Sequence, residues 1–494
     1  PISMNLSDLV QRIPGARLRG PGDVSVARAV HDSRRVRGGD LFVALPGTQM
    51  DGHQFVQAAL EAGAVAAVVQ REVDLPGDPP LVVAPDPREA LGIAAHALAG
   101  DPSRHMTVCG ITGTTGKTTT TYLMRSIFEQ AGRPAGILGT IGYVIGRREI
   151  PSSLTTPDAD DLAGYFAEMR EAGLEAAVME VSSHALHQRR TAGIDFDVGA
   201  FTNLSPEHLD YHEDMVSYRE AKGMLFAGLA EDACAVLNAD EDASRAFAEV
   251  SRAPVLWYGL GSPADVTAEN VRSDTAGSRF TLVTPRGRTE VRTSLLGIHN
   301  ILNSLTAAAI ADALGLSPEA VAAGLEAVRT VRGRLEPVPT TLPFSVLVDY
   351  AHKTDALQHA LATVRDLVHG QGRLIVVFGC GGDRDRQKRP AMAKVAERLA
   401  DRVIVTNDNP RSEVPEAIAD DILVGFDAPE SVTVELDRRE AIADALEEAQ
   451  AGDVVIIAGK GHETYQIIGD VTRPFDDREV AAEILRRLEG QGTT

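Results

Sequence analysis

Cysteine is scarce in this sequence, and long apolar runs are missing from it. The three cysteines, Cys109, Cys234 and Cys380, lie far apart and match neither a disulfide framework nor the spacing of zinc ligands. This usage is typical of the reducing cytosol, so we expect a cytoplasmic protein. No stretch reaches about 18 consecutive apolar residues, and no charged leader precedes an apolar run. The sequence therefore predicts neither a membrane span nor secretion.

Basic residues are also few, with 48 lysines and arginines against 70 aspartates and glutamates. The formal net charge of -22 argues against a nucleic-acid partner or an anionic membrane surface. Solubility is the simplest explanation of this charge. If the substrates are themselves anions, local cations or backbone amides must hold them. The basic residues inside motifs are therefore candidates for function.

The chain of 494 residues is too long for one compact core and predicts two to four domains. In the first hundred residues, short apolar strands at 41–45, 64–69 and 81–84 alternate with helical segments. An alanine-rich helix at 88–100 ends this part. Pro102, which follows Gly100 and Asp101, marks an expected boundary.

The rest of the chain repeats the alternation of strand and helix. Apolar runs in the middle of the chain lie at 176–181 and 196–204, and further runs lie at 345–351, 373–382, 402–409 and 453–459. Strands that are apolar throughout and separated by helices are typical of a parallel sheet covered on both faces. The expected fold class is therefore α/β, with separate sheets in the middle and the last third of the chain.

A glycine-rich loop lies between an apolar strand and a helix at 110–118. Its glycines allow backbone N–H groups to point at phosphate oxygens, Lys117 supplies a positive charge, and Thr118 has a hydroxyl that suits magnesium. The strict Walker pattern requires glycine at 111, where this chain has Ile111. A purely structural turn is the alternative. The lysine–threonine pair and its placement favour nucleotide binding.

Two further polar groups follow apolar strands. Glu180 ends one strand, and His208 lies just beyond another. In an open parallel sheet both would lie at the carboxyl edge, beside the phosphate loop, where they could hold magnesium together with Thr118. The alternatives are a solvated strand end for Glu180 and a loop hydrogen bond for His208.

Lys222 lies in an amphipathic helical segment at 218–226. By periodicity alone, its amine is expected to reach solvent while its stem covers apolar surface. Periodicity therefore gives no reason to select this residue.

Eight motifs occur in order and together form a pattern. They are Gly-Thr-Thr-Gly-Lys-Thr-Thr-Thr at 113–120, Glu-Val-Ser-Ser-His at 180–184, Asn-Leu-Ser-Pro-Glu-His-Leu-Asp-Tyr-His at 203–212, Gly-Ile-His-Asn-Ile-Leu-Asn at 297–303, Asp-Tyr-Ala-His at 349–352, Gly-Cys-Gly-Gly-Asp-Arg-Asp at 379–385, Asp-Asn-Pro-Arg at 408–411 and Gly-Lys-Gly-His-Glu at 459–463. The set resembles the Mur ligases over essentially the whole chain. Within that family it is most similar to the members that add the third residue to a UDP-linked muramoyl dipeptide.

The resemblance implies three α/β domains and an ATP-dependent ligation in peptidoglycan precursor synthesis. It implies an N-terminal UDP-muramoyl-peptide-binding domain at 1–104, a central P-loop-type parallel-sheet ATPase at 105–333 and a C-terminal Rossmann-like domain at 334–494. The implied substrates are UDP-N-acetylmuramoyl-L-Ala-D-Glu, ATP and an amino acid, with Mg²⁺ as cofactor. No partner protein is implied, and we expect a monomer.

The resemblance also implies roles for individual residues. The positions that match catalytic residues are Lys117, Glu180, His208 and Lys222. The positions that match metal ligands are Thr118, Glu180 and His208. Lys222 also matches a lysine that is carbamylated in the family and then serves as an anionic metal ligand. The implied nucleotide contacts are Gly113, Thr114, Thr115, Gly116, Lys117, Thr118, Thr119, Asn300, Asn303, Arg334 and Asp349. The implied muramoyl-peptide contacts are Ser33, Thr155, Thr156, Ser182, Gln188 and Arg190.

The motif Asp408-Asn409-Pro410-Arg411 resembles that of family members that use meso-diaminopimelate. The matching pocket residues are Arg384, Asp408, Asn409, Arg411, Gly459 and Glu463. A guanidinium can bind the distal carboxylate of such a substrate in a bidentate manner, and carboxylates can pair with its ammonium. With lysine or ornithine, Arg411 would remain a buried unpaired charge, which disfavours them. A helix-capping turn that tolerates either substrate is the alternative.

Two features depart from the pattern or admit another interpretation. Lys353-Thr354 follow Asp-Tyr-Ala-His where related chains carry a small pair, and we expect Lys353 to face solvent rather than phosphate. The glycines at 379–382 are weak evidence for a dinucleotide, so no NAD is expected. The rival functions are a related ligase such as folylpolyglutamate synthase, and a nucleotide switch that performs no ligation.

Overall fold

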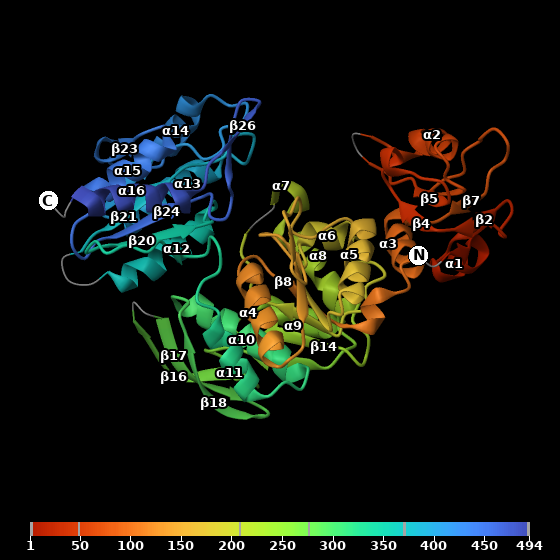
Figure 1. Ribbon diagram of the computed structural model, residues 1–494, viewed down its shortest axis with the longest axis horizontal. Coiled ribbons are helices and arrows are strands. Elements are labelled where there is room, and N and C mark those ends of the chain that lie inside the picture. The colour runs from red at the N-terminus through yellow and green to blue at the C-terminus, as the bar shows by residue number, and fades with distance from the viewer. Residues whose placement is uncertain (1–2, 48–49, 207–208, 275–276, 369–371, 492–494) are drawn as a thin grey trace. The chain divides into compact units, whose positions relative to one another are not determined.

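The computed structural model describes residues 3–47, 50–206, 209–274, 277–368 and 372–491 (Figure 1). The chain divides into two compact units. The first comprises residues 1–268, 282–289 and 303–324, and the second comprises 269–281, 290–302 and 325–494. No helix in the described ranges is long and apolar enough to cross a membrane.

A five-stranded sheet forms the first part of the chain, drawn in red in Figure 1. Its order is β2 (Arg17–Arg19), β7 (Leu81–Val83), β6 (Ala66–Val69), β5 (Asp40–Val43) and β4 (Arg28–Val30), with only β2 antiparallel. A two-stranded sheet of β1 (Met4–Asn5) and β3 (Ser25–Val26) and the helices α1 (Leu6–Arg12), α2 (Val56–Glu61) and α3 (Pro87–Leu98) complete it. The strands expected at 41–45, 64–69 and 81–84 are confirmed as β5, β6 and β7.

An eight-stranded sheet forms the centre of the first unit. Its order is β11 (Arg148–Ile150), β10 (Tyr143–Ile145), β9 (Ala135–Leu138), β12 (Ala176–Glu180), β8 (Thr107–Thr112), β13 (Val198–Phe201), β14 (Cys234–Asn238) and β15 (Val255–Tyr258). The run from β9 to β15 is parallel, as the apolar pattern predicted, and β10 and β11 extend it as an antiparallel hairpin. Its helices are α4 (Lys117–Gln130), α5 (Ala159–Glu171), α6 (Ser183–His187), α7 (Leu209–His212), α8 (Met215–Ala227) and α9 (Ala243–Val250).

Helix α5 joins the central sheet to the five-stranded sheet within the first unit. Ala159 and Ala163 of α5 belong to the same buried cluster as Ala90 and Ala94 of α3. Small side chains on both helices allow a close approach of their backbones, which fixes the start of α5 against the N-terminal sheet.

A three-stranded sheet, β16 (Thr267–Asp274), β17 (Gly277–Thr284) and β18 (Gly287–Thr293), follows the central sheet. The sequence did not predict it, because its strands are mostly polar and lack the continuous apolar runs of the parallel sheets. The helices α10 (Ile298–Ala313) and α11 (Pro318–Ala327) come next.

The second unit contains a six-stranded sheet, with order β19 (Glu336–Pro337), β20 (Ser345–Asp349), β24 (Val454–Ala458), β21 (Leu374–Phe378), β22 (Arg402–Val405) and β23 (Thr433–Val434). All neighbouring pairs are parallel except β19 with β20. Its remaining elements are α12 (Thr354–Leu367), α13 (Lys388–Leu399), α14 (Pro415–Leu423), α15 (Arg438–Glu448), α16 (Asp477–Gln491) and the hairpin β25 (Tyr465–Ile468) and β26 (Val471–Pro474). Both faces of the sheet bury apolar clusters, as expected for a doubly covered parallel sheet.

Candidate functional site

The phosphate loop connects β8, which ends at Thr112, to α4, which begins at Lys117. Glycine is required at two of its positions. Gly113 has φ +147°, and a Cβ there would lie 1.8 Å from Thr202 Oγ1; Gly116 has φ +85°, and a Cβ there would lie 2.3 Å from Asn303 Oδ1. The loop is therefore tightly packed where it enters the helix. The amino end of α4 favours a negatively charged group at this point.

Asn203 holds the turn of the phosphate loop. Its backbone carbonyl accepts a hydrogen bond from the Thr114 N–H at 2.9 Å, and its side-chain Oδ1 accepts one from the Thr115 N–H at 2.9 Å. Thr118 and Thr119, in the first turn of α4, are buried. Among the other expected nucleotide contacts, Asn303 lies against Gly116, as its close approach shows.

Lys117 and Lys222 meet at one backbone carbonyl. Lys117 Nζ donates to Gly113 O at 2.6 Å, and Lys222 Nζ donates to the same oxygen at 3.0 Å. Lys222 lies on α8 and is 1% exposed, with its amine 4.4 Å from the centre of the Tyr218 ring. The solvent-facing orientation that periodicity suggests for Lys222 is therefore wrong, because α8 turns this side chain toward the phosphate loop.

The surroundings of Lys222 disfavour its charged form. Burial lowers the pKa of Lys222 well below its ordinary value, and the nearby charge of Lys117 lowers it further. A lysine in such a site carries a neutral, nucleophilic amine over a wider pH range than a solvated lysine does.

Glu180 lies at the same sheet edge, because β12 is the direct neighbour of β8 and Glu180 pairs in register with Ile111. The carboxylate is buried rather than solvated. Glu180 Oε1 accepts a hydrogen bond from the Thr140 N–H, and Oε2 accepts one from the Thr140 hydroxyl, both at 2.9 Å. The interpretation of Glu180 as a solvated strand end is therefore wrong.

His208, the other expected metal ligand, lies outside the described residues. Within the described ranges, no group of three or more His, Cys, Asp or Glu side chains is placed to hold a metal ion. Thr118, in the first turn of α4, and Glu180, at the end of β12, nevertheless provide a hydroxyl and a carboxylate, which are oxygen donors of the kind that Mg²⁺ prefers. These residues fit a magnesium ion that also has phosphate and water ligands.

The five expected muramoyl-peptide residues of the central sheet lie together beside Glu180. The Thr156 hydroxyl donates to Glu180 O at 2.8 Å and accepts a hydrogen bond from the Ser182 N–H at 3.0 Å. The Thr155 hydroxyl lies 3.2 Å from that of Thr140. Arg190 Nη1 donates to Thr156 O at 2.9 Å, and Nη2 donates to Gln188 Oε1 at 2.8 Å. The structure thus brings these residues into one polar cluster.

Ser33 is placed near this cluster because the residues on either side of it contact the start of α5. It begins a short 3₁₀ turn, Ser33–Arg35. Residues on either side of it contact the start of α5: His31 Nδ1 lies 3.0 Å from Asp160 Oδ1, and Arg35 Nη2 donates to Asp161 Oδ1 at 2.7 Å. Helix α5 begins three residues after Thr156, so Ser33 lies near the polar cluster.

Asn300, Arg334 and Asp349 belong to the second unit. Asp349 ends β20 and is buried; its carboxylate accepts hydrogen bonds from the Leu335 N–H at 2.7 Å and the Ala351 N–H at 2.9 Å. Burial raises the pKa of Asp349, and the Arg334 charge opposes this shift. The Asn300 amide donates to Leu296 O at 2.8 Å. Lys353 lies half-buried at the start of α12.

The loops after β22 and β24 form a second polar cluster. Lys460 Nζ donates to Asn409 Oδ1 at 3.0 Å and to Glu463 Oε2 at 3.1 Å, and it lies 3.9 Å from Asp408 Oδ1. Burial raises the pKa of Glu463, while Lys460 opposes this shift. At Gly459, with φ +120°, a Cβ would lie 2.8 Å from Asp408 Oδ2. Asp408, Asn409, Gly459 and Glu463 are therefore neighbours, as the resemblance implied.

Arg411 and Arg384 lie near this cluster on the loops after β22 and β21. Arg411 Nη1 donates to Gly382 O at 2.8 Å, and Arg384 Nη1 donates to Asp383 O at 3.0 Å. Arg384 is exposed and Arg411 is only half-buried. Arg411 is therefore not fully buried, so the burial penalty expected for its charge with lysine or ornithine as substrate is smaller than the sequence suggested.

Several residues at these sites gave no signal in the sequence. Lys460 lies inside a recognised motif, but only the fold shows that it joins Asn409 to Glu463. Asn203 likewise opens a motif without an assigned role. Arg389 and Arg438 are buried cations whose carboxylate partners lie 24 or more residues away in the chain, so no local pattern could identify them.

Models of three protein families match the chain. Residues 28–98 match the Mur ligase family catalytic domain, 111–311 match the Mur ligase middle domain, and 333–461 match the Mur ligase glutamate ligase domain. The matched segments contain the phosphate loop, Glu180 and Lys222 in the middle domain, and Asp408 and Gly459 in the glutamate ligase domain.

Curated relatives cover nearly the whole chain. A UDP-N-acetylmuramoyl-L-alanyl-D-glutamate--2,6-diaminopimelate ligase of Geobacillus thermodenitrificans (strain NG80-2) is 45% identical over 97% of this chain and 98% of the relative. One of the same name from Geobacter metallireducens is 45% identical over 99% of this chain and its own full length. A solved structure of a protein of that name matches with a TM-score of 0.73 and 32% identity, covering 100% of both chains. The chain belongs to the Mur ligase family and has its three-domain α/β fold.

Proposed function

We propose that this protein is an ATP-dependent ligase that adds meso-diaminopimelate to UDP-N-acetylmuramoyl-L-alanyl-D-glutamate in peptidoglycan precursor synthesis. The convergence of Lys117, Lys222 and Glu180 at one edge of the central sheet carries the proposal. Two lysine amines meet at Gly113 O, and a buried carboxylate lies on the adjacent strand. A nucleotide switch that performs no ligation would not need this second buried lysine.

The first step that we propose joins two anions. The terminal carboxylate of the D-glutamyl residue attacks the γ-phosphorus of ATP, an acyl phosphate forms, and ADP leaves. Repulsion between these groups falls when Lys117 and the amino end of α4 stabilise the phosphate charge. Mg²⁺, when bound by Thr118 and Glu180, would neutralise further phosphate charge.

The polar cluster beside Glu180 supports the placement of the muramoyl peptide. Thr155, Thr156 and Ser182 contribute hydroxyls, and the Arg190 guanidinium is oriented by Gln188 and by the Thr156 carbonyl. Because this cluster adjoins Glu180, a carboxylate held there would face the phosphate loop. Ser33 supplies the corresponding contact from the N-terminal domain.

We further propose that Lys222 is carbamylated. A neutral amine attacks CO₂, forms a carbamate and releases a proton, which changes a cation into an anionic oxygen ligand. The lowered pKa of Lys222 supports this, since only the unprotonated amine reacts. The carbamate oxygens would then complete the metal site with Thr118, Glu180 and His208.

The second step would join the amino acid. Its unprotonated amine attacks the acyl carbon, and phosphate leaves from the tetrahedral intermediate, with loss of the amine proton. Asp408 and Glu463 suit the ammonium and Arg411 suits the distal carboxylate of meso-diaminopimelate. Asn300 of the central domain and Arg334 and Asp349 of the C-terminal domain would contact the nucleotide, and domain closure would keep water away from the acyl phosphate. L-Lysine and L-ornithine remain the alternative substrates.

The domain boundaries at residues 104 and 333, a monomeric state and a cytoplasmic location belong to the same proposal. The three matched family segments support the two domain boundaries, and the scarcity of cysteine supports the location.

The decisive experiment measures ligation itself. The protein is incubated with UDP-N-acetylmuramoyl-L-Ala-D-Glu, ATP and meso-diaminopimelate, and phosphate release is compared with formation of the UDP-linked tripeptide. We expect both only when all three substrates are present. ATP turnover without either of the other substrates, and without tripeptide, would contradict the proposal.

A further inference from the structure

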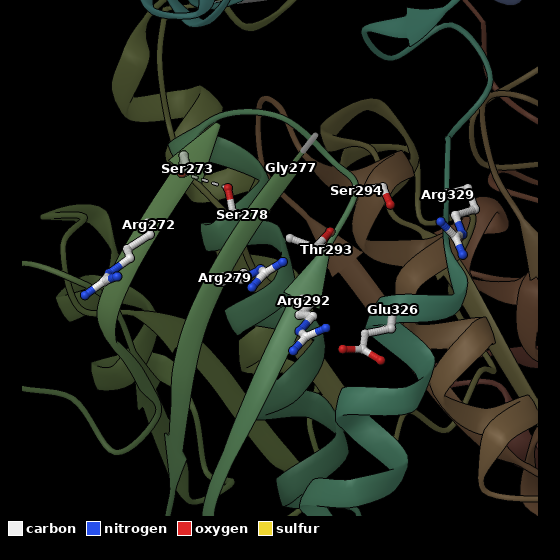
Figure 2. A pocket seen from close by; sticks show the side chains of 10 residues that line it. All are labelled: Arg272, Ser273, Gly277, Ser278, Arg279, Arg292, Thr293, Ser294, Glu326 and Arg329. Atoms are coloured by element: carbon white, nitrogen blue, oxygen red, sulfur yellow. Dashed lines mark hydrogen bonds between the residues drawn. The ribbon is translucent and has the colours of Figure 1, made fainter. Parts of the chain in front are cut away.

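A cavity of about 580 Å³ lies against the three-stranded sheet, apart from every residue assigned above. It is lined by Arg272, Ser273, Gly277, Ser278, Arg279, Arg292, Thr293, Ser294, Glu326 and Arg329, all of the second unit. Figure 2 shows Arg279 and Arg292 extending from neighbouring strands toward the helix that carries Glu326, with Arg329 just beyond the end of that helix. The volume lies within the range of small-molecule sites.

Strand alternation explains why the arginines lie on one open side. Phe280 on β17 and Val291 on β18 are buried, so the adjacent Arg279 and Arg292 point to the opposite, exposed face. The floor is closed at Gly277, which has φ +136° and where a Cβ would lie 1.9 Å from Thr293 O. A side chain at this position would displace β17 from the end of β18.

The charges lining this cavity are not balanced. Four arginines and one carboxylate line it, and among the described side chains none of the four guanidinium groups forms an ion pair or a hydrogen bond. Elsewhere the arginines of this acidic protein are commonly paired, as Arg389 and Arg438 are. Like charges that converge without partners repel each other, and a bound anion would remove that repulsion.

We propose that this cavity binds a small phosphorylated anion with several negative charges. Guanidinium groups match phosphate oxygens in a bidentate manner, and the hydroxyls of Ser273, Thr293 and Ser294 add donors. The cavity size accommodates a polyphosphate or a phosphorylated metabolite rather than a single water-sized ion. The site is separate from the phosphate loop, because none of the loop residues lines it.

The test uses tripolyphosphate and isothermal titration calorimetry, in a Lys117→Ala background that weakens the phosphate loop. We expect saturable binding below about 1 mM that weakens about tenfold for each arginine removed in Arg279→Ser and Arg279→Ser/Arg292→Ser. Arg147→Ser/Arg252→Ser, which removes two exposed arginines elsewhere, should leave binding within about twofold. Citrate, a carboxylate anion, is titrated in parallel.

Three results would overturn the proposal. They are an absence of saturable tripolyphosphate binding, equal binding by the double variant and its parent, and citrate binding as tight as that of tripolyphosphate. Ligation by the Arg279→Ser/Arg292→Ser variant of the otherwise unchanged chain is expected to match the parent. The test is therefore independent of the proposed reaction.

A different set of contacts supports a second inference, which rests on the proposed function. Asp383 and Arg411 are non-glycine residues in the left-handed region, with φ +54° and +51°. Such residues persist only where neighbours impose the conformation. They lie on the two loops that carry Arg384 and Arg411, the expected contacts of the distal carboxylate.

Arg389 of α13 joins these two loops from behind. Its side chain is 0% exposed, and its Nη2 donates to Glu413 Oε1 at 2.8 Å and to Gly381 O at 3.3 Å. Its Nη1 donates to Glu413 Oε2 at 2.9 Å and to Asp421 Oδ2 at 2.8 Å. Glu413 in turn accepts a hydrogen bond from the Asp383 N–H at 2.7 Å.

Ser412 completes the connection between the loops. Its hydroxyl donates to Asp383 Oδ1 at 2.7 Å, and its N–H donates to Asp383 Oδ2 at 3.2 Å. Arg411, directly before Ser412, is thereby held in its strained conformation. We infer that Arg389 is a positioning residue that aims Arg411 and so sets selectivity for a substrate with a distal carboxylate.

The variants Arg389→Met and Arg389→Lys test this role. In Arg389→Met we expect KM for meso-diaminopimelate to rise about tenfold, with KM for ATP within about twofold and a reduced preference over L-lysine. Arg389→Lys should recover part of the loss. Hydrogen exchange at 379–384 and 408–413 should increase in Arg389→Met.

The milder variant Glu413→Gln covers the case in which Arg389→Met does not fold. An unchanged preference for meso-diaminopimelate over lysine in a folded variant, or a parallel rise in KM for ATP, would overturn the inference. If the parent itself fails to use meso-diaminopimelate, the proposed function fails instead. Unchanged exchange in both loops would independently contradict the role of Arg389.

Discussion

Lys222 and Lys460 are both buried lysines at the carboxyl edge of a parallel sheet, but their surroundings are opposite. Lys222 lies beside Lys117 and a backbone carbonyl, and its pKa is lowered by burial and by that second cation. Lys460 lies among Asp408, Asn409 and Glu463. The comparison teaches that burial alone does not assign a role to a lysine. The like charge of Lys117 favours the neutral amine of Lys222, whereas Lys460 joins acidic side chains and an amide through its contacts.

The two regions also differ in how they hold their loops. In the central sheet, the phosphate loop is held by close glycine contacts and by Asn203. In the C-terminal sheet, the loops are held by buried cations. Arg438, for example, pairs with Asp477 at 2.7 Å and also donates to Asn407 O and Ala458 O. The contacts of the phosphate loop leave backbone donors and lysine charge available to bind phosphate. The buried cations of the C-terminal sheet instead fix the positions of the loops around the second polar cluster.

The largest expected effect comes from removing Lys222, the buried lysine beside the phosphate loop. Lys222→Ala should lower kcat by about 10³-fold, because the proposed anionic ligand at the phosphate site is lost. Added formate or acetate should restore part of the activity. The matched variant Lys460→Met should instead act mainly through KM for the amino acid. Initial rates at saturating ATP measure both, and full activity of Lys222→Ala would remove this lysine from the mechanism.

Removing a buried cation that holds the loops of the C-terminal sheet should chiefly affect stability. Arg438→Met leaves Asp477 as a buried unpaired charge, so we expect a loss of about 3–5 kcal/mol in the unfolding free energy of the C-terminal sheet. The double variant Arg438→Met/Asp477→Leu should recover most of it. Urea dependence of hydrogen exchange in β22 and β24 measures the effect. Equal stability of Arg438→Met and the parent would show that the pair does not hold the loops.

Arg411→Ala tests whether the loops of the C-terminal sheet recognise the distal carboxylate of the amino-acid substrate. A charge-assisted contact to the distal carboxylate would be lost, so KM for meso-diaminopimelate should rise about 10- to 100-fold. The rate with L-lysine, which lacks that carboxylate, should change little. Competition of meso-diaminopimelate, lysine and ornithine in the ligation assay provides the measurement. An equal loss with all three amino acids would assign Arg411 a structural role.

The smallest expected effect concerns CO₂ and pH. Because the folded pKa of Lys222 lies below that of an unfolded lysine, the unfolded chain binds this proton more tightly, and the residue's contribution to stability improves as the pH rises. Depletion of dissolved CO₂ should lower wild-type kcat about threefold, and the loss should be greater at lower pH, where the amine is protonated. Bicarbonate should reverse it in the parent but not in Lys222→Ala. A ¹³C NMR carbamate resonance that is present in the parent and absent from the variant checks the assignment.

Local patterns predicted the elements that carry the phosphate loop and most of the parallel strands. Gly113, Gly116 and Lys117 lie within five residues of one another, and the apolar runs at 176–181 and 196–204 became β12 and β13. The three-stranded sheet was missed because its strands are mostly polar and contain no continuous apolar run. The cavity that we propose as an anion site lies on that sheet, so it had no sequence signal either.

The sequence by itself determined the α/β class, the strand–loop–helix phosphate site and the motifs that the chain shares with its relatives, because each depends on residues that are close in the chain. Tertiary structure alone decided that Lys222 is buried against Gly113 O, that Glu180 is not solvated, and that Arg389 and Arg438 join distant loops. The reason is physical. The charge state and the partners of a buried group depend on which distant segments exclude water around it, and no local periodicity encodes that.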